Sequence, residues 1–169
     1  MDLSPTTAEL EASTSDCSTL VVAFSGGADS LLALDLAAEI AARRSQYLVA
    51  WYCHHYATPV EAKRQGIFDA TARRLSRLLG THFQLVKHPV DIDRIAARLG
   101  YSWEHTASLA RRKYLLRLVD SLSRTGRAAV ITGHNYSDYL ETLALRRERK
   151  IPEAALPPLA FAAPETGFF

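Results

Sequence analysis

The sequence predicts an α/β domain with an open parallel sheet and helices on both faces. Two observations lead to this prediction: β-type and helical segments alternate along the chain, and the β-type segments are short apolar runs of the kind that lie buried in parallel sheets. The chain has 169 residues, 48% of them hydrophobic, which is enough for the core of one domain. Right-handed crossovers would bring all the strand carboxyl ends to one edge, where open α/β sheets bind their ligands.

Four apolar segments are expected to form the sheet. They are residues 20–24, 47–53, 83–86 and 128–132. Polar residues follow three of them at the predicted ligand-binding edge. A serine- and glycine-rich loop follows the first strand, His54 and His55 follow the second, and a segment beginning at Gly133 follows the fourth.

Four helices are expected between and after these strands. They span about residues 30–44, 60–79, 91–99 and 106–124. Asp91 is a suitable cap for the third helix and Gly100 a suitable terminator. The second helix is strongly amphipathic, and its two faces are assigned by spacing. The inward residues are expected to be Ile67, Ala70, Leu75 and Leu78, and the outward ones Lys63, Arg64, Arg73 and Arg77.

The domain boundaries are expected near the two ends of the chain. Residues 1–18 are rich in Ser, Thr and acids and are interpreted as a flexible lead-in with some helix around residues 6–11. The folded domain would then cover residues 19–160, and residues 161–169 would form a tail. The lead-in lacks the basic and apolar regions of a secretion signal.

The loop after the first strand is typical of a phosphate-binding site. Residues 25–30 read Ser-Gly-Gly-Ala-Asp-Ser. Gly26 and Gly27 have no Cβ to block a ligand, so successive backbone N–H groups can converge on an anion at the start of a helix. The spacing fits neither the Walker A loop nor the dinucleotide-binding motif. The alternative is an ordinary strand–turn–helix in which Asp29 or Ser30 caps the helix.

The segment after the fourth strand brings carboxylates to the same edge. Residues 132–142 read Thr-Gly-His-Asn-Tyr-Ser-Asp-Tyr-Leu-Glu-Thr. Asp138 and Glu141 are three residues apart and would share one face of a helix that begins near Ser137. The alternative is a purely local role, in which these residues form a capping box and His134 bonds to nearby backbone.

Composition narrows the remaining function classes. The net charge of +2 argues neither for nor against an RNA partner, because the arginines are locally clustered. Cys17 and Cys53 have no metal-binding spacing and suit a reduced, cytoplasmic setting. No apolar run approaches the ~18 residues that span a bilayer, so no membrane association is expected.

These motifs resemble those of a known family. The 25–30 loop is similar to the Ser-Gly-Gly-x-Asp-Ser loop of the N-type ATP pyrophosphatases, the PP-loop superfamily. Residues 132–142 resemble the Thr-Gly-His-x-x-x-Asp-x-x-Glu-Thr segment of the tRNA(Ile)-lysidine synthetases, and residues 50–55, 102–104 and 110–114 resemble further blocks of that family. The resemblance implies an adenine nucleotide alpha hydrolase-like (HUP-type) fold. It also implies that the chain corresponds to the N-terminal catalytic domain only.

The resemblance implies ATP-dependent tRNA modification. Lysine would be ligated to C2 of the wobble cytidine of isoleucine tRNA (CAU anticodon) through an adenylated intermediate, with release of AMP and pyrophosphate. The implied cofactors are ATP and Mg²⁺, and the implied partners are tRNA and L-lysine in the cytoplasm. A homodimer and a separate partner that supplies the missing C-terminal part both stay open.

The resemblance also implies roles for individual residues. Those expected to bind ATP are Ser25, Gly26, Gly27, Ala28, Asp29, Ser30 and His55. The catalytic residues are expected to be Asp29, His134, Asp138 and Glu141, with Asp29 and Asp138 also holding the metal. Those expected to contact RNA are Arg111, Arg112, Lys113 and Arg149. Ser137 stands where the family usually carries an additional Asp.

Three other functions stay open. A tRNA cytidine-thiolating PP-loop enzyme would use a related loop, although it usually has Lys at the position of Ala28 and Cys-x-x-Cys pairs, both of which this chain lacks. An amide-forming pyrophosphatase is disfavoured by the segment that follows the fourth strand. The non-enzymatic alternative is a truncated ATP-binding module without full activity.

Overall fold

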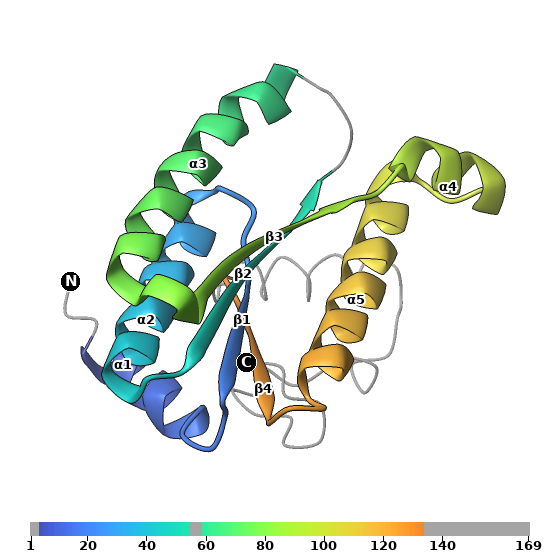
Figure 1. Ribbon diagram of the computed structural model, residues 1–169. Coiled ribbons are helices and arrows are strands. Elements are labelled where there is room, and N and C mark those ends of the chain that lie inside the picture. Colours follow the sequence, from blue (N-terminus) through green and yellow to red (C-terminus); the bar gives the residue numbers. More distant parts are fainter. Residues whose placement is uncertain (1–3, 55–58, 134–169) are drawn as a thin grey trace.

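A four-stranded parallel sheet forms the centre of the molecule in the computed structural model, which describes residues 4–54 and 59–133 (Figure 1). The strands are β1 (Thr19–Ala23), β2 (Tyr47–His54), β3 (Phe83–Pro89) and β4 (Ala128–Thr132). Their order is β3-β2-β1-β4, and every neighbouring pair is parallel. The predicted fold class is confirmed.

The strand order creates a switch point between β1 and β4. From β1 the chain moves to β2 and β3 on one side of the sheet, then crosses back to place β4 on the other side of β1. Val21 of β1 is therefore in register with both Val49 of β2 and Val130 of β4. In open α/β sheets, the crevice beyond the strand carboxyl ends at such a switch point is the usual ligand site.

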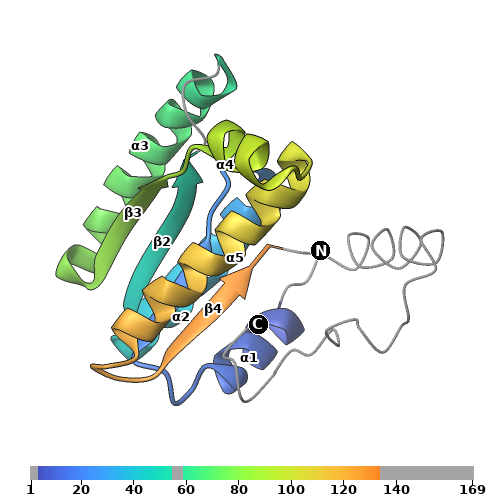
Figure 2. The same ribbon diagram turned by 90° about the vertical axis from the view of Figure 1, so that its right-hand side faces the viewer.

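Helices cover both faces of the sheet, which Figure 1 shows nearly edge-on and Figure 2 shows face-on. On one face lie α2 (Ala28–Arg44) and α3 (Pro59–Leu79), and on the other lie α4 (Ile92–Leu99) and α5 (Trp103–Leu122). The alternation of β1 side chains produces the two cores. Leu20 and Val22 pack with α2 and α3, whereas Val21 packs with α4 and α5. A single 3₁₀ turn, η1 (Gly80–His82), joins α3 to β3.

A helix occupies much of the segment that was expected to be a lead-in. The helix α1 (Ser4–Ser13) is longer than the helical region expected there. The turn after it is held against the domain, because the buried Gln46 side chain donates hydrogen bonds to the carbonyls of Thr14 (3.0 Å) and Cys17 (2.7 Å). Burial raises the pKa of the Cys17 thiol to about 11, so this thiol is protonated at neutral pH.

Capping side chains set where α4 and α5 begin. Asp91 caps α4, as predicted, by accepting a hydrogen bond from the Arg94 N–H at 2.9 Å, and Gly100 ends this helix in the left-handed conformation. The helix α5 begins three residues earlier than predicted, because the Ser102 side chain accepts a hydrogen bond from the His105 N–H at 3.2 Å. No described helix is both long and apolar enough to cross a membrane.

The predicted inward face of α3 is wrong in part. Leu75 is buried as expected, but Leu78 is 56% exposed and Ala70 also faces solvent. The buried residues of this helix are instead Phe68, Thr71, Leu75 and Leu79. The true stripe is rotated from the predicted one because Phe68, which contacts rings of the sheet, sets the orientation of the helix.

Candidate functional site

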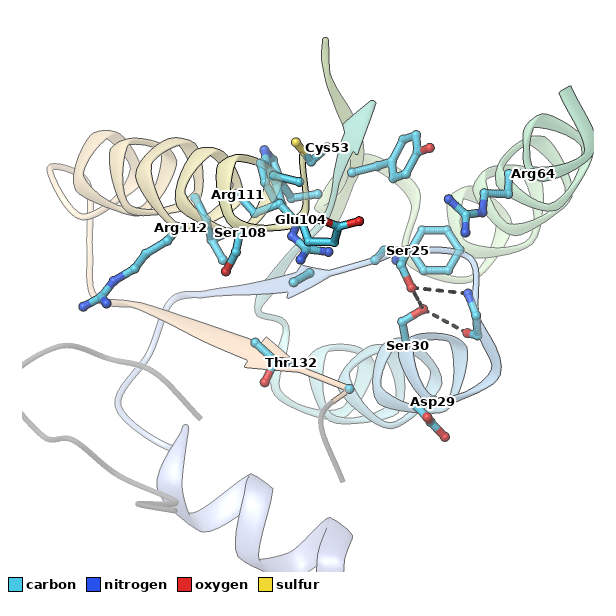
Figure 3. Close-up of a pocket in the computed structure, with 18 of the residues that line it drawn as sticks. Ser25, Asp29, Ser30, Cys53, Arg64, Glu104, Ser108, Arg111, Arg112 and Thr132 are labelled. Carbon is cyan, nitrogen blue, oxygen red and sulfur yellow. Dashed lines mark hydrogen bonds between the residues drawn. The ribbon is translucent and has the colours of Figure 1, made fainter. Parts of the chain in front are cut away.

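A pocket of about 1000 Å³ lies at the carboxyl ends of β1, β2 and β4 (Figure 3). One wall is the loop after β1 with the start of α2, and the opposite wall is the first half of α5. Arg64 of α3 completes the lining, as do Thr132 and Gly133 at the end of β4. The pocket therefore occupies the edge of the sheet that the strand topology predicts.

The loop after β1 leaves the start of α2 without a side-chain cap. Gly27 occupies the N-cap position, with φ −81° and ψ 164°, and has no side chain to bond the first amides of the helix. Neither Asp29 nor Ser30 is the cap, which corrects that alternative. The first N–H groups of a helix have no intrahelical partner and carry partial positive charge. At this helix they adjoin the pocket, which suits an anion.

Two serine hydroxyls hold the loop in shape. Ser30 is buried, and its Oγ donates to the Gly27 carbonyl at 2.9 Å and accepts from the Ser25 N–H at 3.2 Å. The Oγ atoms of Ser25 and Ser30 are 3.1 Å apart (Figure 3). Gly26 adopts φ +80°, in the left-handed region, so a non-glycine residue would be strained there. The loop shape is thus encoded by these four residues.

The end of β4 touches the start of α2. A Cβ added to Gly133 would lie 2.7 Å from the Asp29 carbonyl carbon and 2.7 Å from the Ser30 backbone nitrogen. Only glycine allows this approach, because the atoms that it meets are backbone atoms. Gly133 thereby fixes where the chain leaves β4 relative to the loop.

Arg64 was expected to point outward but lines the pocket. It precedes Phe68 by one helical turn and so extends the buried face of α3 toward the loop. Its Cγ is 3.9 Å from the Cβ position of Gly26, and Figure 3 shows the side chain reaching from α3 toward Ser25. The outward assignment followed the misplaced apolar stripe. A correct assignment of the buried face of α3 would have predicted that Arg64 faces the pocket.

The wall formed by α5 carries charged and polar side chains. Those that line the pocket are Trp103, Glu104, Ser108, Arg111 and Arg112. Figure 3 shows Arg112 directed away from Ser25, toward the β4 side of the site. Lys113, which was predicted together with these arginines, is exposed and does not line the pocket.

The floor at the end of β2 is aromatic. Trp51, Tyr52 and Cys53 line the pocket and are almost fully buried. The Tyr52 ring packs on the Phe68 ring with centroids 4.1 Å apart. Histidines were expected at this end of β2. His54 ends β2, with its ring centroid 6.0 Å from that of Tyr52, whereas His55 lies outside the described residues.

The structure brings together part of the predicted site. Ser25, Gly27, Ala28, Asp29 and Ser30 all line the pocket. Four predicted residues lie, like His55, outside the described part of the chain: His134, Asp138, Glu141 and Arg149. Within the described ranges, no group of three or more His, Cys, Asp or Glu side chains could by itself hold a metal ion.

Comparison with known proteins identifies the family. The model of the PP-loop domain matches residues 4–166, nearly the whole chain. The chain belongs to the PP-loop domain family. PP-loop domains have the adenine nucleotide alpha hydrolase-like fold, and membership of this ATP-utilising family supports ATP binding by the chain.

Curated relatives agree with this assignment. The PP-loop chain is 32% identical over 132 residues to the tRNA(Ile)-lysidine synthase of Borreliella burgdorferi strain ZS7, a match that covers 78% of this chain and 28% of that protein. It is 30% identical over 128 residues to the enzyme of the same name from Borreliella afzelii strain PKo, covering 75% and 27% respectively. The predicted resemblance is confirmed. The match spans less than a third of the length of these relatives.

A solved structure of a universal stress protein in complex with cAMP also matches the PP-loop chain. The match covers 55% of this chain and 89% of that one, at 21% identity and a TM-score of 0.35.

Arg64 is expected to contribute to nucleotide affinity. Replacing it with glutamine removes the α3 cation beside the loop and should weaken ATP binding by about 1.5–3 kcal/mol, the range for hydrogen bonds to charged groups. Arg73 is the matched control, because it lies on the exposed face of the same helix. Titration calorimetry of Arg64→Gln and Arg73→Gln with ATP measures the difference. Equal affinities would remove Arg64 from the site.

Proposed function

We propose that this PP-loop domain activates the wobble cytidine of isoleucine tRNA with ATP so that lysine can be ligated to C2 of the base. The observation that carries the proposal is the uncapped start of α2 in the pocket. The chain is also 32% identical to tRNA(Ile)-lysidine synthase, in a match that covers 78% of this chain. The proposal extends to a cytoplasmic location. It leaves the oligomeric state open.

The triphosphate of ATP would bind at the loop. Backbone amides of Gly27, Ala28 and Asp29 would face the phosphate oxygens, with the hydroxyls of Ser25 and Ser30 beside them. The positive end of α2 and the Arg64 guanidinium would offset the charge of the departing pyrophosphate. The hydrogen bonds of the Ser25 and Ser30 hydroxyls would hold the loop in this shape for the ligand.

The carboxylates of Asp29 and Asp138 would suit a magnesium ion. Mg²⁺ in nucleotide sites is commonly held by one or two carboxylates together with phosphate oxygens, so Asp29, which lines the pocket, and Asp138 would suffice. When bound, the ion would neutralise charge on the phosphates.

The reaction would proceed in two displacements. The O2 atom of cytidine attacks the α-phosphorus of ATP, an O–P bond forms, and pyrophosphate leaves. The ε-nitrogen of lysine, as the free amine, then attacks C2. The C2–O2 bond breaks, AMP leaves with that oxygen, and the new C–N linkage loses a proton. Positioning of the reactants would supply most of the rate.

The remaining predicted residues receive roles under this proposal. Glu141 and His134 would take up or orient protons of the incoming amine, and His55 would border the nucleotide. Basic residues would bind tRNA phosphates. They are Arg111, Arg112, Lys113 and Arg149. Of these, Arg111 and Arg112 lie on the pocket wall.

Isotope exchange between pyrophosphate and ATP tests the activation step. Exchange is expected only when isoleucine tRNA is present, because the acceptor is the base and not a free amino acid. The spent nucleotide should be AMP, which chromatography distinguishes from ADP. Production of ADP and phosphate would contradict the proposal. Exchange that needs sulfur-donor components and produces 2-thiocytidine would favour the thiolating alternative.

A further inference from the structure

We infer that Trp103 is a stacking platform for an unpaired nucleobase of the RNA substrate. The inference rests on the proposed function and adds to it a recognition residue for the acceptor. Trp103 is the first residue of α5, lines the pocket and is 43% exposed. A tryptophan on a pocket wall with this exposure has apolar surface that a nucleobase could contact.

The local structure fixes the backbone of Trp103. The Ser102 side chain caps α5 immediately before Trp103, so the backbone of Trp103 is part of a defined first helical turn. Ala107 and Arg111 follow at intervals of four residues, and both also line the pocket.

The neighbouring charges suit a ligand that carries phosphates, such as a nucleic acid. Arg111 and Arg112 are exposed, and neither makes an ion pair or a hydrogen bond within the described ranges. Proteins that bind single-stranded RNA combine cations that contact phosphates with aromatic rings that stack on bases. A base that undergoes chemistry must also leave its stack, and an aromatic face can replace the lost stacking. The first turns of α5 provide both elements within two to three helical turns.

The adenine of ATP is the other possible source of a nucleobase. The proposed triphosphate site is on the opposite wall, at the start of α2, and the pocket volume of about 1000 Å³ is at the upper end for a single small ligand. The α5 wall is therefore assigned to the RNA. Binding of RNA and binding of ATP are therefore measured separately.

Intrinsic fluorescence can report on Trp103 when Trp103→Phe, which keeps only Trp51, is measured as the reference. The chain has two tryptophans, and the other, Trp51, is 2% exposed. Adding an anticodon stem-loop RNA with the CAU sequence to the full chain is expected to quench the emission of the exposed indole. ATP without RNA is expected to quench it much less. Quenching by ATP that equals quenching by RNA would overturn the assignment of the RNA base.

Substitutions complete the test. Trp103→Ala should weaken binding of the stem-loop on the order of 10- to 100-fold, the range for loss of one base–aromatic stack, while Trp103→Phe should retain most of the affinity. ATP affinity should be unchanged in both variants. Tyr101→Ala is the matched control. Tyr101 lies two residues before Trp103, between α4 and α5; it is 49% exposed but does not line the pocket.

The outcomes separate the inference from the proposed function. Unchanged RNA affinity in Trp103→Ala, with tRNA-dependent pyrophosphate exchange intact, overturns the inference and leaves the proposed function standing. Equal losses in Trp103→Ala and Tyr101→Ala also overturn it. If the wild-type chain binds ATP but neither binds the RNA nor exchanges pyrophosphate in its presence, the inference and the proposed function both fail.

Discussion

Replacing Gly27 with valine is expected to abolish ATP binding while leaving the fold intact. Gly27 has extended backbone angles (φ −81°, ψ 164°) that valine readily adopts, and an added Cβ would meet only the Ser25 Oγ, at 3.5 Å. The branched side chain would project where phosphate oxygens must approach the first amides of α2. Titration calorimetry should detect no ATP binding, and circular dichroism should show a wild-type melting profile.

A smaller substitution at Gly27 tests whether the loss of ATP binding depends on the size of the added side chain. Gly27→Ala adds one methyl group and should reduce ATP affinity less than valine does. Wild-type affinity in a folded Gly27→Val protein would remove the loop from the nucleotide site. Unfolding of that variant would contradict the structural part of the prediction.

Replacing Gly133 with alanine is expected to destabilise the domain and to disturb the site. The new methyl group would lie 2.7 Å from backbone atoms of Asp29 and Ser30, which cannot rotate away as a side chain could. Either β4 or the start of α2 must move, at a cost of about 1–3 kcal/mol in the free energy of unfolding. Urea denaturation measures this loss. ATP affinity should fall as well, because the shifted backbone belongs to the loop.

Gly66→Ala is the matched control for this experiment. Gly66 lies in α3, and a Cβ there would meet no atom within 4 Å. This variant should be as stable as wild type or about 0.5–1 kcal/mol more stable, since alanine favours a helix over glycine. Equal stability of Gly133→Ala and wild type would show that β4 and α2 do not approach each other as closely as described.

Local signals allowed much of the fold to be predicted. The strand at Ala128–Thr132 has the predicted bounds, and Asp91 and Gly100 bound α4 as expected. These features depend on a few adjacent residues, whose turn and capping chemistry is visible in the sequence. The glycine-rich loop after β1 was located for the same reason, and its binding of phosphate stays a prediction. The parallel sheet, with its strand carboxyl ends at one edge, followed from the alternation of elements and from crossover handedness.

Features that depend on tertiary contacts were not predictable in the same way. The faces of α3 were misassigned because the predicted inward set left out Phe68, whose packing against Tyr52 and Phe24 sets the buried face. The role of Arg64 was missed as a consequence. The close approach of Gly133 to α2 joins segments about 100 residues apart, and no local pattern encodes it.

Transfer of labelled lysine to tRNA tests whether this chain ligates lysine to the wobble cytidine. The wild-type chain is to be incubated with ATP, radiolabelled lysine and isoleucine tRNA carrying the CAU anticodon, with Gly27→Val as the matched inactive control. The account predicts label in the tRNA at the wobble cytidine, one AMP released for each lysine attached, and no label with Gly27→Val. ATP consumption that produces ADP, or equal labelling by wild type and Gly27→Val, would contradict it.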